Sequence, residues 1–265
     1  MLVASSATAA GYDDFVRGLS DIHELRFDLA VASFTKALDA GDLSESLVPV
    51  AYVERAYANA EDGNCTAAID DTTAALKFDV NRPEAFYEQG MANLCIGANE
   101  KAEEDFSHAL SLRQSDAAFA GRGRAQWGIG NFEVAAADFA NSAELAPRNP
   151  YYVLWLAISR LRMGTPNITE ATRNIDDLNE SGWPKPILDF YIGRTSADEV
   201  FRFANTGTAD LVSGKRCEAD FYIAEWWILV NDFRRAVPLL HEAQTDCPKN
   251  YIEKFAATVE LKRVK

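Results

Sequence analysis

The chain has 265 residues, of which 48% are hydrophobic and 25% charged, so it can bury a core and is not disordered by composition. Its formal net charge of −14 argues against nucleic acid and anionic membrane surfaces as partners, because both are bound through clustered Lys and Arg. No apolar run reaches the roughly 18 residues that a membrane-spanning helix needs, so we expect no transmembrane segment.

Small and apolar residues make up the first ten positions, MLVASSATAA. Ala7-Thr8-Ala9 fits the small-residue pattern before a signal-peptidase cut, but a charged leading region and a longer apolar stretch are missing. Two interpretations of residues 1–10 therefore stay open: a disordered tail and the remnant of a signal peptide.

Four segments, 15–38, 53–76, 87–110 and 120–143, share one pattern. In each, a small residue follows an Arg or Gln, an alanine follows 12 residues later, and a second small residue comes 7 residues after that. Successive copies are offset by 38, 34 and 33 residues. The first pairs are Arg17-Gly18, Arg55-Ala56, Gln89-Gly90 and Arg122-Gly123, and the alanines are Ala30, Ala68, Ala102 and Ala135.

This pattern has a direct physical interpretation. Small residues allow two helices to cross closely, and larger residues fill the space between them, here Phe34, Leu76, Phe106 and Phe139. Glycines with positive φ end first helices, which places the turns at Gly63, Gly97 and Gly130. Each segment is therefore predicted to be a helix-turn-helix unit.

The recurring unit resembles the tetratricopeptide repeat (TPR), whose period is about 34 residues. The resemblance implies an all-α fold, a right-handed superhelix of stacked helical hairpins with a C-terminal capping helix. We expect four such units over residues 11–147. The first helix of each unit would line the concave side of the superhelix, the surface on which repeat proteins bind peptides or partner proteins.

Residues 148–265 follow the pattern less closely. We expect an apolar helix over 151–164, a partner helix that begins near Pro166, and two short helices around Gly193. Residues 216–250 are predicted to form a final TPR-like hairpin, with Ala236 and Ala243 at the small positions. The last stretch is predicted to be a capping helix whose apolar stripe is Tyr251, Phe255 and Val259.

Several segments of this C-terminal part resemble the NlpI family of bacterial envelope lipoproteins. YYVLWLAISRLRM, WPKPILDFYIG, EADFYIAEWWILVNDFRRAVPLLHEA and NYIEKFAATVEL occur in the order typical of that family. The likeness covers roughly the last hundred residues. It implies a homodimeric adaptor for a periplasmic protease and for peptidoglycan hydrolases. One difference is that no cysteine for lipid attachment follows MLVASSATAA.

The four cysteines suggest two disulfides. Cys217 and Cys247 lie at the start and end of the predicted final hairpin, positions that are side by side in space. Cys65 begins a second helix and Cys95 ends the first helix of the next unit, and those ends also meet. The alternative is four buried free thiols, since cysteine is a common core residue. Disulfides would indicate an oxidising compartment such as the periplasm.

No catalytic, metal or cofactor site is predicted. The three histidines lie outside any known catalytic motif, and the cysteines lack the short C-x-x-C spacing of a metal site. Carboxylate pairs such as Asp70-Asp71 fall on expected helix surfaces, where solvated side chains are the simpler interpretation.

A concave surface is therefore the predicted functional site. Counting back from the turns places five side chains on its inner face: Tyr57, Tyr87, Met91, Arg124 and Trp127. Aromatic residues and Arg often anchor interfaces, although ordinary packing between repeats would use the same residue types. The sequence thus predicts a non-enzymatic periplasmic scaffold or adaptor that binds proteins or peptides. The alternative is a structural or accessory subunit of a secretion or envelope assembly.

Overall fold

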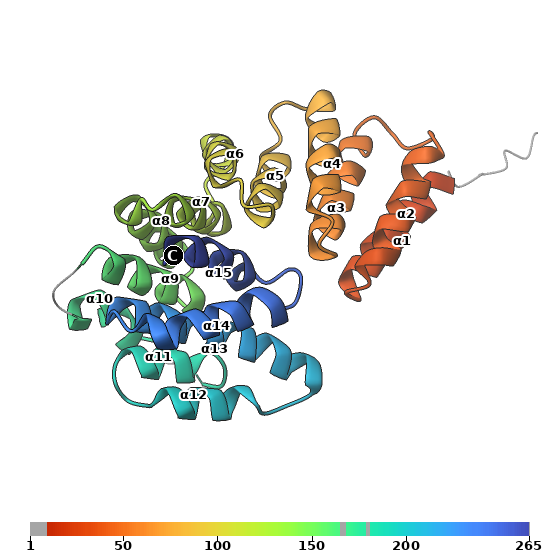
Figure 1. The fold of residues 1–265 in the computed structure, drawn as a ribbon. Helices are drawn as coiled ribbons and strands as arrows, with labels where there is room; N and C mark the ends of the chain where they lie inside the picture. Colours follow the sequence, from red (N-terminus) through yellow and green to blue (C-terminus); the bar gives the residue numbers. More distant parts are fainter. Residues whose placement is uncertain (1–9, 165–167, 179–180, 265) are drawn as a thin grey trace, which may run out of the picture.

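The computed structural model describes residues 10–164, 168–178 and 181–264, and within these ranges it contains fifteen α-helices and no strand (Figure 1). Of the tail expected over residues 1–10, positions 1–9 lie outside the described residues. Ala10 begins the first helix. Pro166, where a helix was expected to begin, is also outside them. No helix in the described ranges is long and apolar enough to cross a membrane.

The first eight helices pair into four hairpins. Within each pair the two helices pack against each other, and the second helix of one pair packs against the first helix of the next. The hairpins stack into a curved array that runs in Figure 1 from α1 and α2 at the right to α7 and α8 at the left. They are α1 (Ala10–His23) with α2 (Phe27–Asp39), α3 (Val48–Glu61) with α4 (Cys65–Phe78), α5 (Pro83–Cys95) with α6 (Asn99–Leu112), and α7 (Asp116–Ile129) with α8 (Phe132–Leu145).

Close crossings of helices explain the repeated small residues. A Cβ atom on Gly18 would lie 2.7 Å from the ring of Phe34, and one on Gly90 would lie 2.9 Å from the ring of Phe106. Phe34 and Phe106 are fully buried. The glycines therefore make room for a phenylalanine from the second helix of the same hairpin, as the sequence pattern indicates.

In the second and fourth hairpins, the repeated Arg before the small residue joins the two helices through polar contacts. Arg55 of α3 holds Asp71 of α4 with two hydrogen bonds, 3.0 and 2.5 Å long, and Arg122 and Asp138 repeat this arrangement in the fourth hairpin. Bidentate arginine–carboxylate pairs fix orientation as well as distance. Arg and Asp are equally spaced in these two units, and the pair sets the relative orientation of the two helices in each hairpin.

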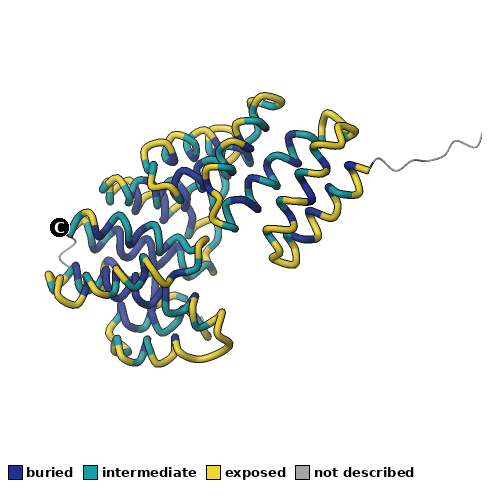
Figure 2. Tube along the Cα trace, turned by 45° about the vertical axis from the view of Figure 1, so that its right-hand side comes forward, coloured by how far each residue is buried: buried dark blue, intermediate teal, exposed yellow. Residues whose placement is uncertain are grey.

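Seven further helices complete the structure. The buried hydrophobic residues of α7 to α15 form one large cluster, whereas α1 to α6 contribute several smaller ones. Figure 2 shows buried positions gathered in the later helices. These helices are α9 (Pro150–Arg162), α10 (Ile168–Asp176), α11 (Lys185–Tyr191), α12 (Ala197–Ala204), α13 (Ala209–Leu229), α14 (Phe233–Asp246) and α15 (Ile252–Arg263).

The structure bonds the cysteines in the two pairs that the sequence suggested. Cys65 at the start of α4 is bonded to Cys95 at the end of α5, with Cα atoms 6.2 Å apart. Cys217 and Cys247 are bonded with Cα atoms 4.8 Å apart. One detail differs from expectation: α13 begins at Ala209, so Cys217 lies two turns inside the first helix of the final hairpin and not at its start.

The last helix, α15, lies in a position that the sequence did not indicate. It packs on α13 and α14 as a cap of the final hairpin would, and it also contacts α5. Ala256, Ala257 and Leu261 are its buried apolar residues, whereas Phe255 and Val259 of the predicted stripe are only half-buried. The helix therefore covers part of the concave side of the superhelix in addition to the final hairpin.

Candidate partner-binding surface

The five predicted surface residues come from three first helices. Tyr57 lies on α3, Tyr87 and Met91 lie on α5, and Arg124 and Trp127 lie on α7. The structure does not bring them together in one open groove, because α15 divides them into two groups. Arg124 and Trp127 lie beneath α15, and the other three line a pocket beside it.

Trp127 is part of the core. Only 1% of its surface is exposed, and its ring packs edge-on against Trp155 and Phe221 with centroids 5.3 and 6.0 Å apart. The guanidinium of Arg263 lies over the same ring, 5.0 Å from its centroid. Contrary to the sequence expectation, Trp127 does not face an open groove, because α15 covers it.

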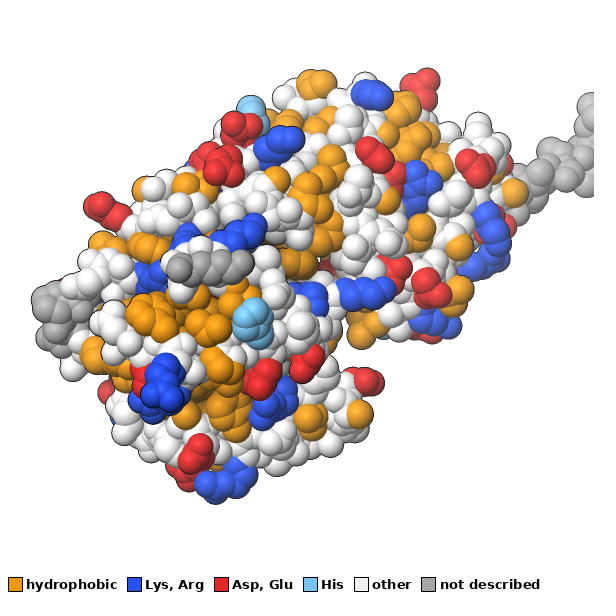
Figure 3. Space-filling model, viewed as in Figure 1, with side chains coloured by type: hydrophobic (Ala, Val, Ile, Leu, Met, Phe, Trp, Pro, Cys, Tyr) orange, Lys and Arg blue, Asp and Glu red, His pale blue; other side chains and the backbone are white. Residues whose placement is uncertain are grey.

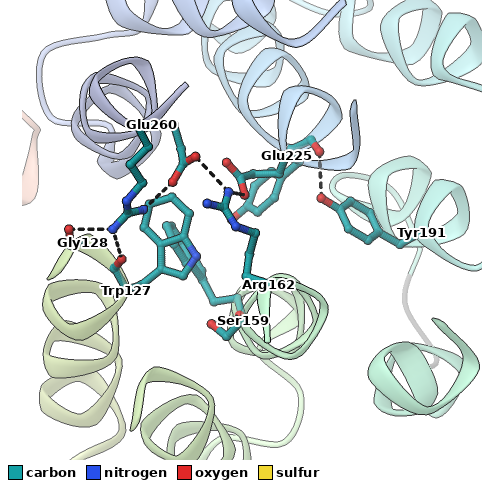
Figure 4. A network of polar contacts seen from close by, with 10 residues as sticks. Trp127, Gly128, Ser159, Arg162, Tyr191, Glu225 and Glu260 are labelled. Atoms are coloured by element: carbon teal, nitrogen blue, oxygen red, sulfur yellow. Dashed lines mark hydrogen bonds and ion pairs between the residues drawn. The ribbon is translucent and has the colours of Figure 1, made fainter. Parts of the chain in front are cut away.

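A polar network holds α15 in this position (Figure 4). Arg162 of α9 lies between Glu225 of α13 and Glu260 of α15, at 3.1 and 2.8 Å. Arg263 bonds to Glu260 and donates to the carbonyl oxygens of Trp127 and Gly128 at 2.6 and 2.7 Å. Those carbonyls lie near the end of α7, where helical carbonyls lack partners within the helix. Three helices that are distant in sequence are thus joined to α15.

Arg124 also faces α15. It lines a small cavity of about 20 Å³ together with Trp155 of α9 and Phe255 of α15, and its guanidinium lies 5.9 Å from the centroid of the Trp155 ring. A cavity of this size holds about one water molecule. Arg124 is therefore half-buried and supports the packing of α15.

The remaining predicted residues line one pocket of about 80 Å³ between α3, α5 and α15. We call it the inner pocket. Tyr57 packs edge-on against Phe27, and Tyr87 packs edge-on against Phe106, with centroids 6.0 and 5.7 Å apart, so both rings are held from behind. Its lining residues are Tyr57, Ala60, Glu61, Tyr87, Glu88, Met91, Cys95, Asn250 and Phe255.

The loop between α14 and α15 closes one side of the inner pocket. Asn250 donates a 2.7 Å hydrogen bond to Glu61, and Lys249 donates to the carbonyl oxygen of Asp62 at 3.3 Å. A second cavity, of about 260 Å³, adjoins the inner pocket and shares Tyr87 and Glu88 with it. The accessible concave surface thus runs along α5, with Tyr87 and Glu88 at its middle.

The inner pocket is acidic. Burial, followed by the charges of Glu54 and Glu61, raises the pKa of Glu88 to about 8. Burial and the charges of the same three glutamates raise the pKa of Tyr57 to about 12, so its phenol stays protonated. No Lys, Arg or His is among the described residues that line this pocket.

Glu61 and Glu88 of the inner pocket, and the neighbouring Glu54, were not predicted from the sequence. A usable signal existed, because Glu54, Tyr57 and Glu61 follow one another at helical spacing and therefore share one face of α3. Glu88 is adjacent to Tyr87, which was predicted. Within the described ranges, no group of three or more His, Cys, Asp or Glu side chains is placed to hold a metal ion.

No protein-family model matches the chain. Solved structures share its fold. A tetratricopeptide repeat protein from Parabacteroides merdae has a TM-score of 0.58 and 16% identity, over 96% of this chain and 98% of that one. PilW, a widely conserved type IV pilus biogenesis factor, has a TM-score of 0.57 and 16% identity, over 97% of this chain and 99% of that one. PilF from Pseudomonas aeruginosa has a TM-score of 0.55 and 14% identity, over 95% of this chain and 97% of that one. At this identity the likeness establishes the superhelical TPR fold and nothing further.

Proposed function

We propose that this protein is a non-enzymatic scaffold of the bacterial periplasm that binds a segment of a partner protein on its concave surface. The inner pocket carries this proposal, because it combines rigid aromatic walls with an unneutralised acidic floor on the face that repeat folds use for binding. The TPR fold supports a role in protein interaction.

The periplasmic location is supported by the cysteines. All four are placed in disulfides, and disulfides persist in oxidising compartments. The resemblance of the C-terminal segments to the NlpI family extends the proposal to a homodimeric adaptor that recruits envelope proteases or peptidoglycan hydrolases.

A second candidate is an accessory subunit of an envelope or secretion assembly. It is favoured by the likeness to PilW, a type IV pilus biogenesis factor, over almost the whole of both chains. The two candidates differ in the partner, since an adaptor co-purifies with a protease or hydrolase and an accessory subunit with structural components of an assembly.

Affinity purification after cross-linking in the native envelope tests both candidates. We expect Tyr57→Ala with Met91→Ala to reduce recovery of the partner by about tenfold or more, because truncated interface anchors typically cost at least 1 to 2 kcal/mol. Val134→Ala on α8, whose side chain is 44% exposed and far from the inner pocket, is the control. If the double variant keeps its unfolding midpoint and still recovers the partner in full, the concave surface is not the binding site.

A further inference from the structure

Glu88 lies at the centre of the accessible concave surface without a bonding partner. Its carboxylate lines both the inner pocket and the adjoining cavity. Among the described residues, none forms a hydrogen bond or an ion pair with it, and burial is the leading cause of its raised pKa. Glu88 is half-buried in these cavities, and a carboxylate that is partly withdrawn from water is stabilised by a counter-ion. The described residues supply none.

The α3 helix, which packs against α5, adds negative charge around Glu88. This helix contributes Glu54 and Glu61, whose pKa values are raised chiefly by burial. The loop that closes one side of the pocket contributes the neutral Asn250 and, beside it, Lys249, whose ammonium group lies 3.7 Å from the carboxylate of Asp62. Among the described residues that line the adjoining cavity, Arg113 is the one cation, and it is paired with Glu84 at 2.7 Å. The positive charge of Arg124 on α7 opposes the rise in the pKa of Tyr87, but Arg124 is not among the residues that line the inner pocket.

The walls suit the stem of a long cationic side chain. Tyr57, Tyr87, Met91 and Phe255 present aromatic and thioether surfaces on several sides of the acidic floor. Arginine and lysine bury their methylene stems on such surfaces, and their charged groups are attracted by aromatic faces. The pocket volume of about 80 Å³ admits one side chain but no folded element.

Overall acidity does not explain this arrangement. On the face drawn in Figure 3, acidic and basic side chains are interspersed, and no single acidic field covers it. A preference for a cation at the inner pocket over the rest of this face therefore depends on the groups of the pocket.

We propose that the inner pocket accepts an arginine or lysine side chain from a partner protein, with Glu88 as its counter-ion. This inference rests on the proposed function and adds the chemistry of the segment that binds. It also predicts a pH dependence. With a pKa of about 8 in the free protein, Glu88 is mostly protonated at pH 6 and mostly ionised at pH 9, so a cationic segment binds more tightly as the pH rises.

Short peptides test the proposal with the full chain. The probe is acetyl-Ala-Leu-Arg-Leu-Ala-amide, and its reference carries citrulline, a neutral group of the same shape, in place of arginine. We expect the arginine peptide to bind about tenfold or more tightly than the citrulline peptide at pH 9 in calorimetric titrations, with the difference shrinking at pH 6. Equal affinity of the two peptides at pH 9 would overturn the proposal.

Two charge-neutralising variants make the assignment specific. Glu88→Gln removes the counter-ion and is expected to abolish both the preference for arginine and its pH dependence. Glu104→Gln, an exposed position on α6, makes the same change in net charge and is expected to alter neither. A preference for arginine that survives Glu88→Gln would contradict the proposal, as would spermidine binding as tightly as the arginine peptide.

The outcomes separate this inference from the scaffold function. If the cross-linked partner is lost in the Tyr57→Ala, Met91→Ala variant but retained in Glu88→Gln, the scaffold function stands and the cation proposal fails. If the arginine peptide binds as expected but no partner protein is recovered from the envelope, the proposed scaffold function fails by itself.

Discussion

At the scale of single residues, Phe106 shows how little space the repeats leave. Its ring lies between Gly90 of α5 and Gly121 of α7, and a Cβ atom on either glycine would overlap the ring. Phe106 is fully buried and also supports Tyr87 of the inner pocket. One phenylalanine thus fixes the crossing of three helices and the position of a binding-site ring.

We predict that Gly90→Ala destabilises the protein by about 1 to 2 kcal/mol, although alanine is the better helix former by about 1 kcal/mol. The reason is the 2.9 Å approach of the new Cβ atom to a ring that has no free space to move into. Urea unfolding measures the change. Adding Phe106→Leu should give a smaller loss than the sum of the two single changes, and strictly additive effects would show that the two residues do not compete for space.

A second residue-scale feature is a pair of buried carboxyl groups. Glu218 of α13 accepts hydrogen bonds from Tyr151 and Trp183 at 2.9 and 2.8 Å. Burial and then the charge of Glu253 on α15 raise the pKa of Glu218 to about 8. The pKa of Glu218 is higher in the folded state than in the unfolded chain. The contribution of protonated Glu218 to the stability of the fold is therefore present in full below about pH 4 and is lost as the pH rises towards 8.

We therefore predict that Glu218→Gln weakens the fall in stability between pH 5 and pH 8 and raises the unfolding temperature at pH 8. The amide oxygen still accepts the bonds from Tyr151 and Trp183, whereas the charge is removed. Thermal unfolding followed by circular dichroism at three pH values measures this, with Glu104→Gln as control. Parallel pH profiles for Glu218→Gln and the parent protein would contradict the assignment.

At the scale of elements, α15 is the piece that departs most from a simple repeat stack. Its Arg263 and Glu260 bind α7 and α9, and its apolar residues cover Trp127. Sequence patterns identify such a helix but not the surface on which it packs, because that choice depends on contacts between residues 98 to 136 positions apart.

Deleting residues 251–265 is predicted to lower the unfolding midpoint and to shift tryptophan fluorescence to longer wavelength. The physical reason is that Trp127 and Trp155 would be exposed to water once α15 is removed. The milder change Arg263→Ala is expected to act in the same direction with a smaller effect. An unchanged midpoint and emission maximum after the deletion would mean that α15 does not cover these rings in solution.

The two disulfides are the other feature at this scale. We predict no titratable thiol in denatured, unreduced protein that was folded under oxidising conditions, and linked peptides that join Cys65 to Cys95 and Cys217 to Cys247. Each bond closes a loop of 30 residues, so its reduction should cost on the order of 3 kcal/mol, with most helix retained. Four free thiols, or a link between Cys95 and Cys217, would remove the support for a periplasmic location.

At the scale of the whole molecule, the sequence predicts the repeated part better than the rest. Close helix crossings demand small residues at fixed spacing, so Gly18, Gly90 and the glycine turns mark the first four hairpins. Of the five predicted surface residues, Tyr57, Tyr87 and Met91 share one pocket, whereas Arg124 and Trp127 are covered. The difference arises because helical periodicity places a side chain on the inner face but does not reveal what else lies there.

The central claim is that a partner binds at the inner pocket and not on the convex side. A photoreactive amino acid at Met91, compared with the same group at Val134, tests this in intact cells. We predict a covalent adduct with a partner protein from position 91 and none from position 134. Adducts of equal yield from both positions, or from position 134 alone, would contradict the account.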